Sequence, residues 1–247
     1  MVLLFALSMP FPVNAMELKT AAQESAPKYY TIERNKMAGI CIDIMNAIES
    51  FDPEINFSGY EDFLPFKRLQ MYLENGEIDV FFGFKKTTKR EERYNFLDVP
   101  LYQVNYVIAT LVDDNTNIHD FEDIRSLGSK GRILTVSGSA ASRFLQRQGG
   151  LLIDDSARSP STLLKKLAGG RGRLAFYHDL GLRTMIEREN LEHKIKILPT
   201  SFSKYHHYAA FSKNIPPGTV SKVGRAIKGL INNGELARIK RKYKLKE

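Results

Sequence analysis

The sequence predicts an α/β protein of two lobes, each a mostly parallel sheet flanked by helices and joined to the other by two hinge strands. Apolar runs of strand length alternate with segments of helical period, which is typical of a parallel sheet covered by helices. This alternation starts afresh after a polar turn at 113–115. We therefore expect lobe 1 to comprise 16–110 and 207–247, and lobe 2 to comprise 111–206.

The composition is that of a globular protein, 43% hydrophobic and 26% charged over 247 residues. This length can bury a core in one large domain or in two of about 100 residues each. The formal net charge is +8, and much of the excess lies at 238–246. A basic balance can indicate nucleic acid or an anionic membrane as a partner, but a solvated helix face explains it equally well. We expect no nucleic-acid partner, no stable membrane insertion and a monomer.

Lobe 1 is expected to contain two well-marked helices in its first part. One follows Gly39, and its apolar residues recur at i, i+3, i+4 and i+7 from Cys41. Pro65 can open the other, since proline is tolerated in a first turn, and Gly76 stands where a C-terminal cap belongs. The run 78–84 is nearly continuously apolar, as a central parallel strand would be. The other strands expected in this part are 17–21, 55–58 and 104–112.

Lobe 2 repeats the alternation of strands and helices. Ser161 is expected to cap a helix that ends at Gly169-Gly170, and Asp179 to open a helix that runs to Glu189. The chain would return to lobe 1 by a strand at 208–212 and finish in two helices. The remaining helices expected in lobe 2 are 121–127 and 140–148, and the strands are 132–136, 174–177 and 195–198.

The segment 76–102 carries the first half of a candidate binding site. Its apolar strand runs into a polar turn with Thr87 and Arg90. Open α/β sheets build small-molecule sites at the carboxyl ends of their strands, where a hydroxyl and a guanidinium can bind an anion. The neighbouring charges, considered alone, favour a solvated turn instead.

Residues 1–15 resemble a signal-peptide remnant. The run 2–15 is apolar, is interrupted by Pro10 and Pro12, and ends in Val-Asn-Ala. It is too short to span a bilayer, and its small final residues fit a cleavage site. No Lys or Arg precedes the run, which departs from the usual pattern. We expect the protein to be exported.

We expect neither a metal nor a cofactor. Cys41 is the only cysteine, so the chain can form no intrachain disulfide and no cysteine metal cluster. The five histidines include no His-x-x-x-His pair. His206 and His207 would point to opposite faces of a strand, which is poor geometry for shared ligation.

Several short motifs occur in a fixed order from Leu18 to Leu245. They are Gly39 with Asp43, Pro65-Phe66 with Arg68, the turn 76–79, Thr87 to Arg90, Phe96, Pro100, Tyr102, the segments 136–139 and 175–179, and the closing 234–239. This order resembles the bacterial extracellular solute-binding proteins of family 3, the polar amino-acid type. The resemblance implies the two-lobed type II periplasmic binding fold, with a ligand site between the lobes.

The resemblance also implies roles for individual residues at an anion subsite. Arg90 would bind the α-carboxylate of a ligand bidentately, and Thr87 would add a hydroxyl. Ser139 and Ala140 would offer backbone N–H groups at a helix start. Arg68 would be either a second anion contact or a surface charge.

The remaining roles concern the ammonium and apolar parts of the ligand. Asp179 would pair with the α-ammonium, although a helix N-cap alone would also explain it. Phe66 and Tyr29 (or Tyr30) would form aromatic walls, or belong to the core. Gly83 and Phe84 would form the floor of the site.

The function implied is capture of a small polar solute, above all an amino acid, and its delivery to an ABC permease, without catalysis. Two alternatives stay open. One is an enzyme on the same fold, resembling cyclohexadienyl dehydratase, which would need an acid or base in the cleft. The other is a ligand-sensing module.

Overall fold

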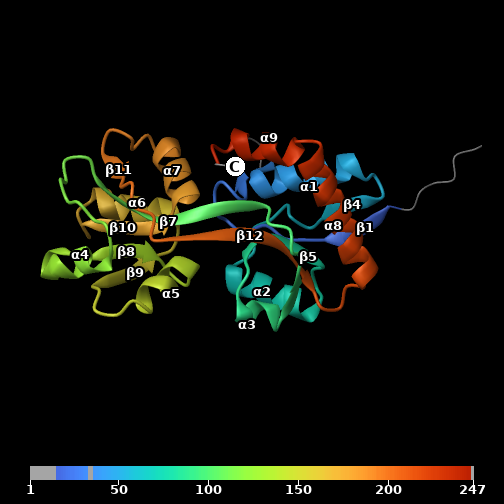
Figure 1. Cartoon of the computed structure of the whole chain (residues 1–247), viewed down its shortest axis with the longest axis horizontal. Coiled ribbons are helices and arrows are strands. Elements are labelled where there is room, and N and C mark those ends of the chain that lie inside the picture. The colour runs from blue at the N-terminus through green and yellow to red at the C-terminus, as the bar shows by residue number, and fades with distance from the viewer. Residues whose placement is uncertain (1–14, 33–35, 246–247) are drawn as a thin grey trace, which may run out of the picture.

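The computed structural model describes residues 15–32 and 36–245 and shows two lobes side by side (Figure 1). Two long strands, β7 (Tyr102–Leu111) and β12 (Ser203–Ser212), run between the lobes and pair antiparallel where they cross. The expected signal peptide lies outside the described residues except for its last one. No helix in the described part of the chain is long and apolar enough to cross a bilayer.

Lobe 1 places helices on both sides of a layer of strands (Figure 1). Helix α1 begins after Gly39 and buries the residues that its period predicts, Cys41, Ile44, Met45 and Ile48. Helix α2 ends at Gly76, which has the left-handed conformation expected of a C-terminal cap. The helices are α1 (Ile40–Phe51), α2 (Phe66–Asn75), α3 (Thr88–Glu91), α8 (Pro217–Asn232) and α9 (Glu235–Lys242), and the strands are β1 (Met16–Lys19), β2 (Tyr30–Thr31), β3 (Met37–Ala38), β4 (Ile55–Ser58), β5 (Val80–Lys85) and β6 (Tyr94–Phe96).

Lobe 2 is built on three parallel strands, with β8 between β9 and β10. Strand β7 adds antiparallel to β10, and β11 adds antiparallel to β7. The strands are β8 (Ile133–Val136), β9 (Ile153–Ala157), β10 (Leu174–His178) and β11 (Ile195–Ile197), and the helices are α4 (Phe121–Ser126), α5 (Ala140–Gln146), α6 (Pro160–Ala168), α7 (Asp179–Arg188) and a 3-10 turn at Gly128–Lys130.

The apolar run 78–84 differs from its expected pairing. It forms β5, which pairs antiparallel with the returning strand β12, while the parallel pair of lobe 1 is β1 with β4. Burial explains the continuous apolar pattern, because Phe81, Phe82 and Phe84 are each at most 1% exposed. An apolar run reports burial on both faces, and parallel and antiparallel neighbours can both provide it.

Two helix caps also differ from expectation. Ser159, not Ser161, caps α6: its Oγ accepts a hydrogen bond from Thr162 N at 3.1 Å, while Ser161 Oγ donates to Glu189. His178 caps α7, because its Nδ1 accepts from Gly181 N at 2.9 Å.

Each lobe has its own apolar core. The two cores divide within β7, between Val104 and Tyr106, and again between Leu198 and Ala209 on the return. The sequence analysis placed the first boundary between the lobes at 110, which is later in β7 than the division between the two cores.

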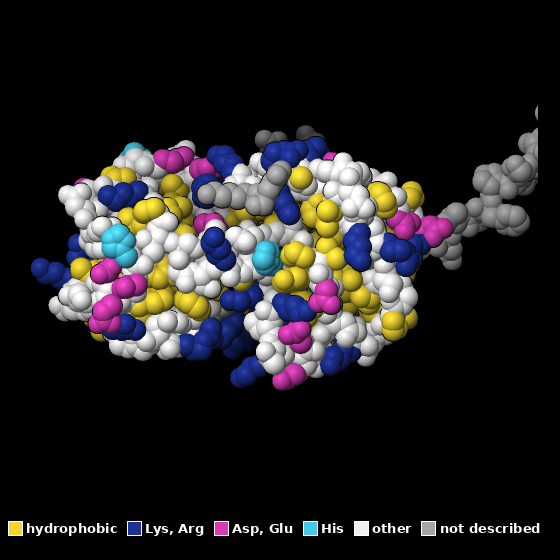
Figure 2. All heavy atoms as spheres, viewed as in Figure 1, with side chains coloured by type: hydrophobic (Ala, Val, Ile, Leu, Met, Phe, Trp, Pro, Cys, Tyr) yellow, Lys and Arg dark blue, Asp and Glu magenta, His cyan; other side chains and the backbone are white. Residues whose placement is uncertain are grey.

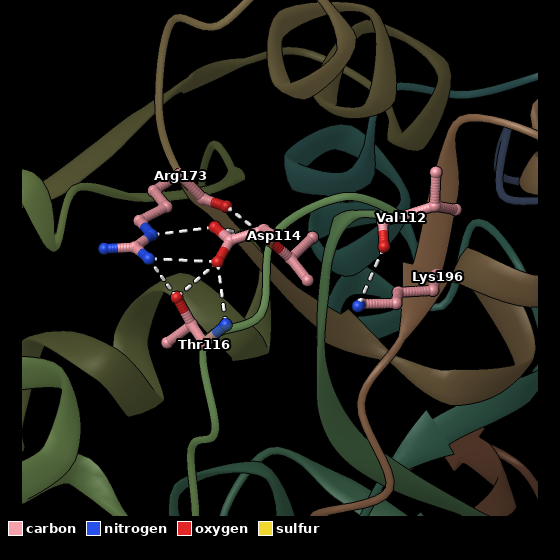
Figure 3. Close-up of polar contacts among 6 residues, drawn as sticks. Val112, Asp114, Thr116, Arg173 and Lys196 are labelled. Carbon is pink, nitrogen blue, oxygen red and sulfur yellow. Dashed lines mark hydrogen bonds and ion pairs between the residues drawn. The ribbon is translucent and has the colours of Figure 1, made fainter.

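A charged network holds the turn that follows β7 within lobe 2 (Figure 3). Arg173 binds both carboxylate oxygens of Asp114, with Nε 2.7 Å from Oδ2 and Nη2 2.9 Å from Oδ1. Thr116 N donates to the same carboxylate, and Lys196 Nζ donates to Val112 O nearby. Hydrogen bonds from Arg173 hold the pKa of Asp114 well below its usual range. The polar turn at 113–115 is therefore a fixed connection.

Gly39 allows the start of α1 to lie against the backbone of Lys28. Its φ of 137° and ψ of 169° lie in a region open essentially to glycine alone. A Cβ at this position would lie 2.1 Å from Lys28 O. Ile40 N and Cys41 N donate to the carbonyls of Pro27 and Lys28, so this contact holds the segment before β2 in place.

We expect Gly39→Ala to lower the free energy of unfolding by about 2–4 kcal/mol, because it adds both a clash and backbone strain. Gly218→Ala is the matched control, since a Cβ there meets nothing within 4 Å. Urea unfolding measures both variants as a shift in midpoint at constant slope. Equal shifts in the two variants would contradict this account of Gly39.

Candidate functional site

A cavity of about 640 Å³ lies between the two lobes. Its walls come from both lobes and from the crossing strands β7 and β12. Figure 2 shows the molecule hollowed at this junction, with Lys and Arg side chains gathered around the hollow. The volume falls in the range of small-molecule sites.

The structure brings most of the candidate residues together at this cavity. Those that line it are Phe66, Gly83, Phe84, Arg90, Ser139 and Ala140. Those that do not line it are Tyr29, Arg68, Thr87 and Asp179.

Arg90 is held rigidly at the lobe 1 side of the cavity. It is 9% exposed, its Nη1 donates to Lys85 O at 2.8 Å, and its guanidinium lies 4.5 Å from the Phe84 ring centre and 5.6 Å from that of Phe66. Burial, followed by the positive charge of Arg143, lowers the pKa of Arg90 to about 10, so it stays charged at neutral pH. No carboxylate among the described residues forms an ion pair with it within 4.0 Å.

Three of the candidates outside the cavity have structural contacts or face solvent. Thr87 is exposed, and its backbone carbonyl accepts from Arg90 N at 2.8 Å, which starts α3. Tyr29 is fully buried, and its hydroxyl donates to Phe82 O at 3.0 Å. Arg68 is exposed on α2. Thr87 therefore orients the turn through its backbone, and Tyr29 belongs to the core of lobe 1.

Asp179 connects α7 to the crossing strand β7. Its Oδ1 accepts from Asn105 N at 3.0 Å and from Leu180 N at 2.8 Å, and its Oδ2 accepts from Asn105 Nδ2 at 2.8 Å. As the first residue of α7 it directs its carboxylate to β7 instead of the cavity, so both oxygens already have donors.

Gly83 leaves room at the floor of the cavity. Its φ is 91°, and it lies where the pairing of β5 with β12 skips a residue, between Phe82 and Phe84. A Cβ there would lie 3.1 Å from Cys41 Sγ, 3.1 Å from Tyr102 OH and 3.3 Å from Lys28 Cδ. Cys41 and Tyr102 contact each other below this point, with Sγ and OH 3.7 Å apart.

The sequence analysis missed several charged and imidazole groups that line the cavity. Lys28 stands between buried residues before β2, in a segment with no period to mark it. His178 is the last residue of the buried strand β10, so the rule that sites form at strand ends could have found it. The alternation along β12 could have marked His207 as inward-facing. The missed groups are Lys28, Lys67, Lys85, Arg143, Arg158, His178 and His207.

Burial keeps the two imidazoles neutral. His178 and His207 are each 5% exposed, with ring centres 6.4 Å apart. Burial, with a smaller effect of the Lys28 charge, lowers the pKa of His178 to about 3 and that of His207 well below its usual value. His207 Nδ1 is buried and has no hydrogen-bond partner in the described structure. A polar atom buried without a partner is costly and usually serves a ligand or water.

No group of three or more side chains able to hold a metal ion occurs among the residues that the structure describes. The family model for bacterial extracellular solute-binding proteins, family 3, matches residues 18–246. This chain belongs to that family. A search among curated protein sequences found no match for this family 3 protein.

Solved structures similar to this family 3 protein share its fold at low identity. The probable amino-acid ABC transporter extracellular-binding protein ytmK from Bacillus subtilis superimposes with a TM-score of 0.77 at 18% identity, covering 93% of this chain and 97% of that one. An ancestral arginine-binding protein bound to glutamine gives 0.74 at 20% identity, covering 92% and 97%. The GluR0 ligand-binding core from Nostoc punctiforme, in complex with L-glutamate, gives 0.73 at 18%, covering 92% and 98%.

Lys28 is a buried charge that the fold tolerates at the floor of the cavity. It is 8% exposed, and its Nζ reaches Gln23 Oε1 at 3.4 Å. Burial lowers the pKa of Lys28 to about 8, while Cys41 opposes the shift and Arg90 adds to it. The pKa of Lys28 in the folded protein lies below that of an unfolded lysine. The buried charge therefore lowers the free energy of unfolding by its full amount below pH 8, and this loss of stability diminishes as the pH rises towards the pKa of the unfolded lysine.

We expect Lys28→Met to raise the free energy of unfolding at pH 7 by about 1–3 kcal/mol, because it keeps the packing and removes the buried charge. The difference from the parent protein should shrink between pH 8 and pH 10 in urea unfolding. Lys228→Met, an exposed position on α8, is the control and should change little at any pH. A Lys28→Met variant less stable than the parent at pH 7 would contradict the account.

Proposed function

We propose that this protein captures a small polar solute of the amino-acid class between its lobes and delivers it to an ABC permease. It would act in the periplasm as a monomer, after export by the segment 1–15. The observation that carries the proposal is Arg90, a buried and charged guanidinium without a carboxylate partner in the described structure, at the wall of an interlobe cavity. A guanidinium fork matches a carboxylate bidentately.

The surroundings of Arg90 support this role. Phe84 and Phe66 lie near its guanidinium, and Lys85 O accepts from Nη1, so the side chain is preorganised before a ligand arrives. Ser139 and Ala140 line the cavity from lobe 2. A solute that contacts both walls would favour the closed arrangement of the lobes, which is how a two-lobed protein can signal occupancy to a permease.

The names of similar structures agree with amino acids as the ligand class. Two of the three structures described above hold glutamine and glutamate, and the third is named as an amino-acid transporter component. Another is an ancestral amino acid-binding protein described as a precursor of cyclohexadienyl dehydratase, with a TM-score of 0.74 at 15% identity. We propose binding without turnover, because the family is one of solute-binding proteins and the three structures described above are named as binding proteins or ligand-binding cores.

We expect Arg90→Ala to weaken solute binding by about 100-fold or more, since a charge-assisted pair of hydrogen bonds is lost. Arg90→Lys should fall between the parent and the Ala variant, because it keeps the charge and loses the fork. Calorimetry against the amino acids and small dicarboxylates measures affinity, and X-ray scattering measures closure of the lobes.

Arg225→Ala removes the same charge from an exposed position on α8 and should leave affinity within about twofold. Circular dichroism confirms that each variant is folded. Failure of every amino acid and dicarboxylate to bind the parent, or equal binding by Arg90→Ala, would refute the proposal.

A further inference from the structure

We propose that the solute carries two anionic groups and that the cavity does not depend on an ammonium group for recognition. This inference rests on the proposed function and specifies its ligand. It follows from the charges of the lining residues, from their lack of ion-pair partners and from the position of the acidic side chains.

Cationic side chains from both lobes line the cavity. Lobe 1 supplies cations from α2, α3, the end of β5 and the segment before β2, and lobe 2 supplies one arginine from α5 and one directly after β9. Figure 2 shows Lys and Arg side chains around this hollow. The cations that line it are Lys28, Lys67, Lys85, Arg90, Arg143 and Arg158. Even one bound monoanion would leave much of this charge uncompensated.

These cations have no ion-pair partners within the described residues, unlike many basic residues elsewhere. Away from the cavity, Arg93 pairs with Glu74 and Arg173 pairs with Asp114. The six lining cations form no such pair within 4.0 Å. Lys85 instead places its Nζ 4.3 Å from the Tyr205 ring centre. Like charges facing one another across a cleft repel, and focus the field on an incoming anion.

Among the residues that the structure describes, no acidic group is placed to bind an ammonium inside the cavity. Both oxygens of Asp179 accept from Asn105 or Leu180, and this residue does not line the cavity. Glu24 lines it but is exposed to solvent, where an ion pair is worth about 1 kcal/mol or less. A ligand ammonium would therefore meet cations and little compensating charge.

Proton uptake by His207 and Lys28 provides a second test of the proposal. His207 Nδ1 is buried without a partner in the described structure. Burial above all, then the charges of Lys28, His178, Arg90 and Lys85, holds the pKa of His207 well below its usual value. Tyr102 and Tyr205 are the other rings packed against it. A bound dianion would raise the pKa of both His207 and Lys28, since it offsets the neighbouring positive charges. Protons should be taken up on binding near pH 8.

The test uses matched solutes that differ in one group. L-Glutamate, glutarate and L-glutamine share a five-carbon skeleton, and L-aspartate, succinate and L-asparagine share a four-carbon one. In the better-fitting set, we expect the dicarboxylate to bind at least as tightly as the acidic amino acid, and the amide at least about 30-fold more weakly. Calorimetry in buffers of different ionisation enthalpy should show proton uptake at pH 8.

Each other result counts against a specific claim. An amide, or L-arginine, that binds as tightly as the acidic solutes would overturn the requirement for two anions while leaving the proposed function intact. An acidic amino acid that binds more than about tenfold tighter than its dicarboxylate would overturn the claim about the ammonium. Absence of binding by every amino acid and dicarboxylate would refute the proposed function itself.

The lobe 2 arginines supply the variant test. Arg143 and Arg158 are exposed, so replacing both by Gln should leave the fold intact. We expect the double variant to bind the dicarboxylate about tenfold or more weakly and to discriminate less against the amide. Arg171→Gln removes one charge from an exposed position of lobe 2 outside the cavity, and should change affinity by less than about twofold. An unchanged ratio of dicarboxylate to amide affinity in the double variant would refute the role of lobe 2 in charge recognition.

Discussion

The antiparallel pairing of β7 with β12 determines the positions of the two lobes and of the side chains that these strands contribute to the cavity. Five residue pairs, from Tyr102 with His207 to Tyr106 with Ser203, join the strands where the chain passes between lobes. The pairing holds His207 beside Tyr102 at one end, and near the other end Asn105 on β7 binds the carboxylate of Asp179 at the start of α7. A shift of one residue in register would turn these side chains to the opposite face. Both the spacing of the lobes and the lining of the cavity therefore depend on one short ladder.

The buried charges that would bind a ligand at the floor of the cavity also lower the stability of the fold. Lys28 and Arg90 are both charged and largely removed from water, and the described residues offer neither of them a carboxylate. Gly39 and Gly83 supply the close backbone approach and the space that this arrangement requires. Unpaired buried charge is destabilising. An anionic ligand in the cavity would pair with these charges. Because the ligand binds only the folded protein, its binding would raise the free energy of unfolding and offset part of this cost.

The sequence predicts the parts of this structure that depend on local pattern. The face of α1, the end of α2 at Gly76 and the place of Arg90 after a buried strand all follow from period, turn chemistry and strand-end logic. Strand pairing is not local, so the sequence could not show that β5 lies antiparallel to β12. The direction of Asp179 depends on Asn105, 74 positions away. The approach of Lys28 to the cavity likewise depends on a contact with Gly39 that no periodicity reveals.

The position of Cys41 has a practical consequence. It is the only thiol of the chain, it is fully buried in lobe 1, and its Sγ contacts the hydroxyl of Tyr102. Burial raises the pKa of this thiol to about 11, so little reactive thiolate forms at neutral pH. A second cysteine introduced at the mouth of the cavity could therefore carry a fluorophore without competing labelling. The molecule is in this respect already suited to become a reagentless optical sensor for its solute.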